Sequence, residues 1–179
     1  MFGSKDRRRE QYIDSYRFGA ALEDRVRSEH HEISGADCIS VFEGLRHWFQ
    51  VCRVANHHFV AMPSIAVDAA WHEFILCTRD YAACCAGAFG RFLHHTPAGA
   101  LSTPDPVNTM RKGYALTWHH ACVIDGVDPY TPDRLPLLFA IDDRVGMPGG
   151  FRYDVAEIAA ERSAARRQSN QDGLPHSRR

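Results

Sequence analysis

The stretch that decides the fold is residues 62–97, MPSIAVDAAWHEFILCTRDYAACCAGAFGRFLHHTP. It is the part of the chain that is richest in Trp, His, Cys and Phe. Ser64 can cap a helix, and Asp68 then falls early in it, where a negative charge suits the helix dipole. Asp68 and His72 stand at positions i and i+4, so they share one helix face. The pattern therefore predicts a helix that carries a carboxylate beside an imidazole.

A second helix is expected to run from Thr78, which can cap it, to about the His94–His95 pair. If the chain turns back near Thr78, His72 and Cys85 lie at similar height on facing antiparallel helices. The His94–His95 pair then returns close to the start of the first helix. If Thr78 is only a kink in one long helix, His72 and Cys85 lie about 20 Å apart, at about 1.5 Å rise per residue. The first arrangement is the expectation, and the second is its alternative.

The candidate metal ligands are Asp68, His72, Cys85 and His95, with His94 as an alternative to its neighbour. Imidazole, thiolate and carboxylate suit zinc or another divalent transition metal, and helical bundles build such sites from facing helices. Asp68 can instead orient His72 by accepting a hydrogen bond from its ring. The spacing matches no standard zinc motif. The competing interpretation is therefore a buried Asp68–His72 pair with Cys85 as core packing.

The same residues allow a thiol enzyme, with Cys85 as nucleophile, His72 as base and Asp68 as the group that orients the base. A reactive cysteine normally sits at a helix N-terminus or another electropositive position. Cys85 instead falls within a predicted helix, between Cys84 and Ala86. This placement favours a binding role over catalysis.

Two runs of residues carry a resemblance to a known family. The first is VDAAWH at 67–72, followed by Tyr81, Cys85, Phe89-Gly90 and His95. The second is RLPLLFAID at 134–142, followed by GFRY at 150–153. Over residues 42–153 the chain resembles the glycine-rich domain-containing protein-like family, and the second run resembles its small bacterial branch. The resemblance implies no particular activity. Eukaryotic members tend to read Trp-His-x-His, whereas this chain has Phe74 at the second histidine position.

Composition describes an ordinary soluble protein of one domain. The chain has 179 residues and a formal net charge of -1, so no overall field attracts nucleic acid. No apolar run approaches the roughly 18 residues of a membrane span. The six cysteines form no CxxC pair, and the first residues form no apolar signal core. We therefore expect a cytoplasmic protein that binds neither membranes nor nucleic acid.

Apolar residues recur with the period of an α-helix along most of the chain, and no window shows the alternation of apolar and polar residues that is typical of a strand. The expected class is all-α, a compact bundle of about six helices with a central helical hairpin and disordered termini. The expected helices cover residues 5–31, 38–55, 64–77, 78–94, 107–124 and 133–144, the last capped by Asp133. The helical domain is expected over residues 1–153. Residues 154–179 are expected to be a polar tail, with a transient helix to about 167 and disorder from 169.

These observations favour a non-catalytic module that binds a protein partner and has a metal site near His72. The alternative is a metal-dependent or thiol enzyme that uses Asp68, His72 and Cys85. The two hypotheses differ in geometry, because a site requires ligand atoms that converge on an accessible pocket.

Overall fold

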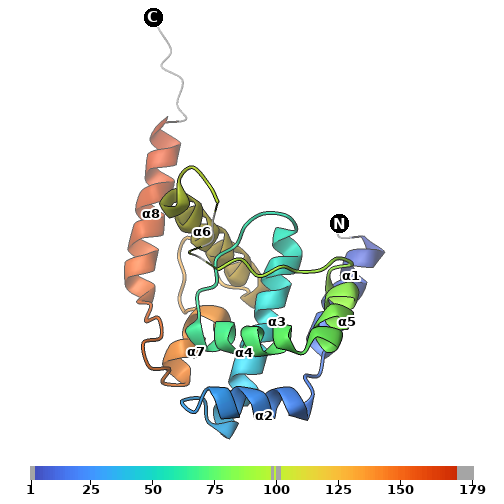
Figure 1. The fold of residues 1–179 in the computed structure, drawn as a ribbon. Helices are drawn as coiled ribbons and strands as arrows, with labels where there is room; N and C mark the ends of the chain where they lie inside the picture. Colours follow the sequence, from blue (N-terminus) through green and yellow to red (C-terminus); the bar gives the residue numbers. More distant parts are fainter. Residues whose placement is uncertain (1–2, 98, 100–101, 173–179) are drawn as a thin grey trace, which may run out of the picture.

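The computed structural model describes residues 3–97, 99 and 102–172, and over these residues it contains helices and no strands (Figure 1). The helices are α1 (Ser4–Ser15), α2 (Ala20–Glu29), α3 (Gly35–Ala55), α4 (Ile65–Leu76), α5 (Thr78–Ala88), α6 (Pro106–Asp125), α7 (Leu137–Arg144) and α8 (Val155–Asp172). The all-α prediction is confirmed. The predicted number of about six helices is too low, since the described part of the chain forms eight.

One additional helix arises because the predicted helix over residues 5–31 is interrupted. Tyr16 ends α1 in an extended conformation, and Gly19, also extended, precedes α2. The interruption places the partly buried Phe18 against the core, where its ring stacks on Phe42 at 4.9 Å and meets Phe74 edge-on at 5.3 Å. These aromatic contacts are favourable and help to offset the helical hydrogen bonds that the interruption removes.

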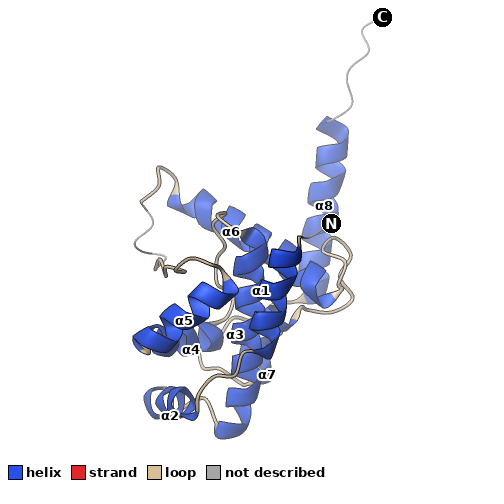
Figure 2. Ribbon diagram, turned by 90° about the vertical axis from the view of Figure 1, so that its right-hand side faces the viewer, coloured by secondary structure: helices blue, strands red, loops and turns tan. Residues whose placement is uncertain are grey.

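The other additional helix is α8, which occupies most of the predicted tail. Residues 169–172, predicted to be disordered, belong to this helix. Residues 173–179 lie outside the described part of the chain, as do residues 1 and 2. Figure 2 shows α8 extending beyond the other helices, while Ile158 near its start packs against the core. None of the described helices has the length and apolar character needed to cross a membrane.

The helix that contacts most of the other helices is α3, and not one of the 62–97 stretch. It contacts α1, α2, α4, α6 and α7, and Figure 1 shows it passing through the middle of the molecule. The predicted core helix over residues 38–55 is thus confirmed. Gly44 allows α4 to approach α3 closely, because a Cβ at this position would lie 2.7 Å from Val67 Cγ2.

The predicted break near Thr78 is confirmed, since α4 ends at Leu76 and α5 begins at Thr78. The antiparallel hairpin is not formed. Figure 1 shows α5 leaving α4 at an elbow instead of running back along it. The second helix also ends at Ala88 and not near residue 94, because Gly90 adopts a φ of 68°. The segment that returns over α4 is therefore an extended loop.

The N-terminus of α4 is fixed by a buried carboxylate from α7. Asp142 is 1% exposed and accepts hydrogen bonds from Ser64 Oγ and from the backbone N–H groups of Ile65, Ala66 and Phe151. Negative charge at this end of a helix is favourable because it complements the free N–H groups and the dipole. The start of α4 is therefore held in place by a distant part of the sequence.

The start of α7 differs from the prediction. The helix begins at Leu137 with Pro136 as its N-cap residue, so Asp133 does not cap it. The cap comes from Asp125 at the end of α6, whose Oδ2 accepts from Leu137 N at 2.6 Å. The other oxygen of Asp125 lies 2.9 Å from His47 Nε2 on α3. One carboxylate thus joins α3, α6 and α7.

Candidate metal centre

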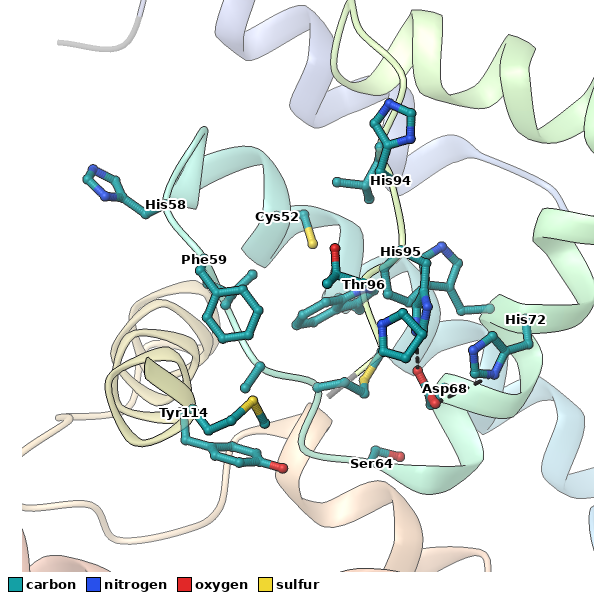
Figure 3. A pocket seen from close by; sticks show the side chains of 18 of the residues that line it. Cys52, His58, Phe59, Ser64, Asp68, His72, His94, His95, Thr96 and Tyr114 are labelled. Carbon is teal, nitrogen blue, oxygen red and sulfur yellow. Dashed lines mark ion pairs between the residues drawn. The ribbon is translucent and has the colours of Figure 1, made fainter. Parts of the chain in front are cut away.

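Asp68, His72 and His95 converge at one point of the surface (Figure 3). Asp68 Oδ2 lies 3.5 Å from His72 Nδ1, and Asp68 Oδ1 lies 3.4 Å from His95 Nε2. The two imidazole rings are edge to face, with centroids 4.4 Å apart. One ligand atom from each of the three residues lies within 4.8 Å of the others. The carboxylate therefore stands between two imidazoles.

The loop after α5 brings His95 to this point. Tyr81 donates its hydroxyl to the carbonyl of Leu93 at 2.5 Å, and Trp71 Nε1 donates to the same hydroxyl at 3.2 Å. The ring of His95 then packs edge-on against Trp71, with centroids 4.8 Å apart. Because Trp71 and Tyr81 are buried, these contacts hold the loop against α4. The imidazole of His95 is positioned by this core contact.

The three side chains differ in exposure in a way that suits capture of an ion from solvent. The side chain of His72 is 48% exposed, that of Asp68 33% and that of His95 18%. An ion can reach the group directly, while the more buried imidazole gives a fixed ligand direction. Three nitrogen and oxygen ligands of this kind suit zinc and other divalent transition metals.

The group lines one side of a cavity of about 480 Å³. Figure 3 shows Phe59 and Tyr114 on the side opposite Asp68 and His72. Burial, and secondarily the nearby Asp68 carboxylate, raise the pKa of Tyr114, so its hydroxyl stays protonated at neutral pH. The three candidate ligands therefore share one cavity with two aromatic side chains, Phe59 and Tyr114.

Cys85, a predicted ligand, does not join the group. Its side chain is 1% exposed, it does not line the cavity, and burial raises the pKa of its thiol. His94 lines the cavity, but its ring packs against Phe92 with centroids 4.9 Å apart. Figure 3 shows His94 pointing away from Asp68. Of the predicted residues, the structure brings together Asp68, His72 and His95.

Sequence reasoning missed the cavity and most of its lining residues, of which Trp48 and Tyr114 are examples. Both lie among the apolar residues of predicted helices, which is the pattern expected of core side chains. Periodicity indicates which helix face is buried, but it does not show where facing helices leave space. No signal within the sequence separates a cavity wall from a packed core.

The comparison with protein-family models gives one match, to the UCP032817-like family over residues 8–173. The chain belongs to the UCP032817-like family. The UCP032817-like match contains Asp68, His72 and His95, and it runs past residue 153 to include α8. No curated protein and no solved structure matches the chain.

Proposed function

We propose that the protein binds one divalent transition-metal ion, zinc in the first instance, through Asp68, His72 and His95. The observation that carries this proposal is the convergence of one carboxylate and two imidazoles, with their ligand atoms within 4.8 Å of one another. Each oxygen of Asp68 faces one ring, since Oδ1 lies 3.4 Å from His95 Nε2 and Oδ2 lies 3.5 Å from His72 Nδ1.

The role of the ion is to bind a further molecule. Sites with three protein ligands keep at least one coordination position open, whereas structural zinc sites are closed by four. The three residues line a cavity of about 480 Å³, which is within the range of small-molecule sites, so a molecule bound there would be beside the ion. The function that the geometry supports best is therefore metal-dependent ligand binding.

A second candidate function is a metal-dependent hydrolase. It is favoured by the same open position, because a water bound to zinc there would ionise near neutral pH and become a nucleophile. The thiol-enzyme alternative receives no support, since Cys85 is buried away from His72 and its pKa is raised.

A protein partner stays a prediction. Its support is the exposure of two aromatic residues that line the cavity, Phe59 at 36% and Phe151 at 39%. A cytoplasmic location is favoured by the six free cysteines, since oxidising compartments pair such residues. The relationship to the glycine-rich domain-containing protein-like family, including its bacterial branch, rests on residues 67–72 and 134–142 and also stays a prediction.

Elemental analysis of protein expressed with ample zinc, iron, manganese and cobalt tests the metal proposal. We expect about one equivalent of a divalent metal per chain in the parent protein. His95→Gln should lose it, whereas His94→Gln should keep it, because His94 lines the same cavity but points away from Asp68. A parent protein without metal, or equal metal in both variants, contradicts the proposal. Turnover of esters or phosphoesters that depends on the bound metal would favour the hydrolase.

A further inference from the structure

A second cavity lies where α1 meets the end of α3 and the loop that follows α5. Its volume is about 210 Å³, and its wall includes Asp6, Arg9, Arg53 and Arg91. Figure 1 shows α1 beside α5, and α1 also contacts α3. Three segments that are far apart in the sequence thus each bring one arginine to the same small cavity.

The guanidinium groups of Arg53 and Arg91 lie beside this cavity, as their hydrogen bonds show. Arg53 Nη1 donates to Asp6 Oδ1 at 2.6 Å, and Arg91 Nη2 donates to the carbonyl of Asn56. Asp6 and Asn56 both belong to the wall. The charged ends of the two arginines are therefore at the wall, and not only their aliphatic stems.

The guanidinium of Arg9 occupies space that a side chain at residue 90 would fill. A Cβ added to Gly90 would lie 3.2 Å from Arg9 Cζ. Gly90 stands between Phe89 and Arg91, which both belong to the wall. Within the described part of the chain, Arg9 forms no hydrogen bond or ion pair. Its N–H donors are therefore available to another molecule.

The wall has more positive than negative charge. Among its described residues, Asp6 is the only acidic one, against three arginines. Asp6 pairs with Arg53, and so does Glu10, at 3.5 Å, although Glu10 does not line the cavity and its side chain is 49% exposed. Neither acid forms an ion pair with Arg9 or Arg91. These two arginines therefore lack an acidic partner at the cavity.

This arrangement suits a phosphate group. Guanidinium groups bind phosphate and carboxylate strongly, through N–H donors that can act in pairs. A carboxylate offers two oxygens in one plane, whereas phosphate offers oxygens in three dimensions and about two negative charges. Arginines from three separate segments match the second pattern. The volume of about 210 Å³ is below the roughly 300–1,000 Å³ of most small-molecule pockets, so the anion is small.

We propose that this cavity binds a phosphate group, either free or as part of a small phosphomonoester. Arg9 and Arg91 donate to its oxygens. Arg53 adds positive charge to the same wall and is held in place by Asp6, since its side chain is 6% exposed. The site goes beyond the metal centre, because none of the three proposed metal ligands lines this cavity.

Calorimetric titration of the full-length protein with inorganic phosphate tests this inference. EDTA is present, so that phosphate cannot bind through a metal, and about 0.15 M salt screens long-range attraction. We expect saturable binding at one site, and binding about tenfold weaker or more in Arg9→Gln, which loses a charge-assisted hydrogen bond. Arg8→Gln should bind like the parent protein, because Arg8 is the exposed neighbour on α1 and does not line the cavity. Absence of saturable binding to the parent protein, or equal affinities in the two variants, overturns the inference.

A second variant tests the location if Arg9→Gln does not fold. Arg91→Gln keeps an N–H donor for the carbonyl of Asn56 and removes the charge, so it should also weaken binding about tenfold or more. Unchanged affinity in Arg91→Gln overturns the inference. Acetate should bind the parent protein about tenfold more weakly than phosphate, and equal binding overturns the assignment to phosphate.

Titration with phenyl phosphate distinguishes the two sources of the phosphate group. Tighter binding than inorganic phosphate assigns a phosphomonoester, and weaker binding assigns the free ion; either order upholds the site. Because EDTA removes metal from every sample, the result does not depend on the proposed function. Loss of the metal proposal would therefore leave the phosphate site standing, and the reverse also holds.

Discussion

Asp142 accepts a hydrogen bond from the hydroxyl of Ser64 at 2.6 Å, deep in the core. The same carboxylate accepts from the N–H groups of Ile65 and Ala66, so α7 supplies the cap of α4. Since α4 carries two of the three proposed metal ligands, the candidate site depends on a contact between residues far apart in the sequence.

We expect Asp142→Ala to lower the free energy of unfolding by about 3 kcal/mol or more, because it leaves several buried donors without an acceptor. Urea denaturation at pH 7 measures the change. The matched control is Asp143→Ala, since the neighbouring carboxylate is 73% exposed and pairs with Arg152 at 3.0 Å on the surface. The free energy of unfolding of the control variant should fall by less than about 1 kcal/mol. Equal losses in the two variants would show that the cap does not hold α4.

Gly44→Ala should destabilise the protein by about 1–3 kcal/mol, although alanine is the better helix former. The added Cβ would lie 2.7 Å from Val67 Cγ2 and 3.1 Å from Ile141 Cγ1. Gly35→Ala on the same helix is the control, because its nearest neighbour would be an ordinary contact at 3.6 Å. Thermal unfolding of the two variants measures the difference in their stability. A Gly44→Ala protein as stable as the control would contradict the close packing of α3 on α4.

The carboxylate of Asp125 should make stability depend on acidic pH. Burial by itself raises the pKa of Asp125, but hydrogen bonds from His47 and the N–H of Leu137, together with nearby positive charge, lower it below its ordinary 3.8. A lowered folded-state pKa gives stability that is present above the unfolded value and is lost as pH falls through the folded one. Asp125→Asn should therefore be about 1–2 kcal/mol less stable at pH 7. The difference should shrink below about pH 4. Urea denaturation at both pH values checks this, and a constant difference would contradict it.

Metal removal should lower thermal stability. An ion that binds only the folded state raises the free energy of unfolding by about 2.7 kcal/mol when its free concentration is one hundred times its Kd. For a chain of this size, this corresponds to an increase in Tm of about 5–10 °C. Addition of EDTA to the zinc-loaded protein should cause this decrease, and excess zinc should reverse it. His95→Gln should show no response to either. A parent protein with the same Tm in EDTA and zinc would oppose a folded-state metal site.

Local sequence signals identified much of the fold. The cap at Ser64 and the break before Thr78 were predicted from residue type, and both are confirmed by the bounds of α4. The interruption at Tyr16 was missed, because the burial of Phe18 against Phe42 depends on a partner in another helix. The cap of α7 was assigned to Asp133, whereas Asp125 supplies it from α6. Contacts between distant residues decide these points, and periodicity carries no information on them.

The candidate site was also predicted only in part from the sequence. The pairing of Asp68 with His72 follows from helical spacing and was predicted. His95 reaches the pair by a loop that Gly90 starts and Tyr81 holds, instead of by a second antiparallel helix. The expected hairpin also placed Cys85 beside His72, but α5 leaves α4 at an elbow, and Cys85 belongs neither to the group of Asp68, His72 and His95 nor to the cavity wall.

The central claim is that Asp68, His72 and His95 hold one metal ion. Its most direct test is a crystal structure of zinc-loaded protein with anomalous diffraction measured above and below the zinc absorption edge. We predict one strong anomalous peak per chain, about 2.0–2.2 Å from an Asp68 oxygen and from one ring nitrogen each of His72 and His95. A peak at other histidines alone, or no peak in crystals grown with excess zinc, would contradict the account.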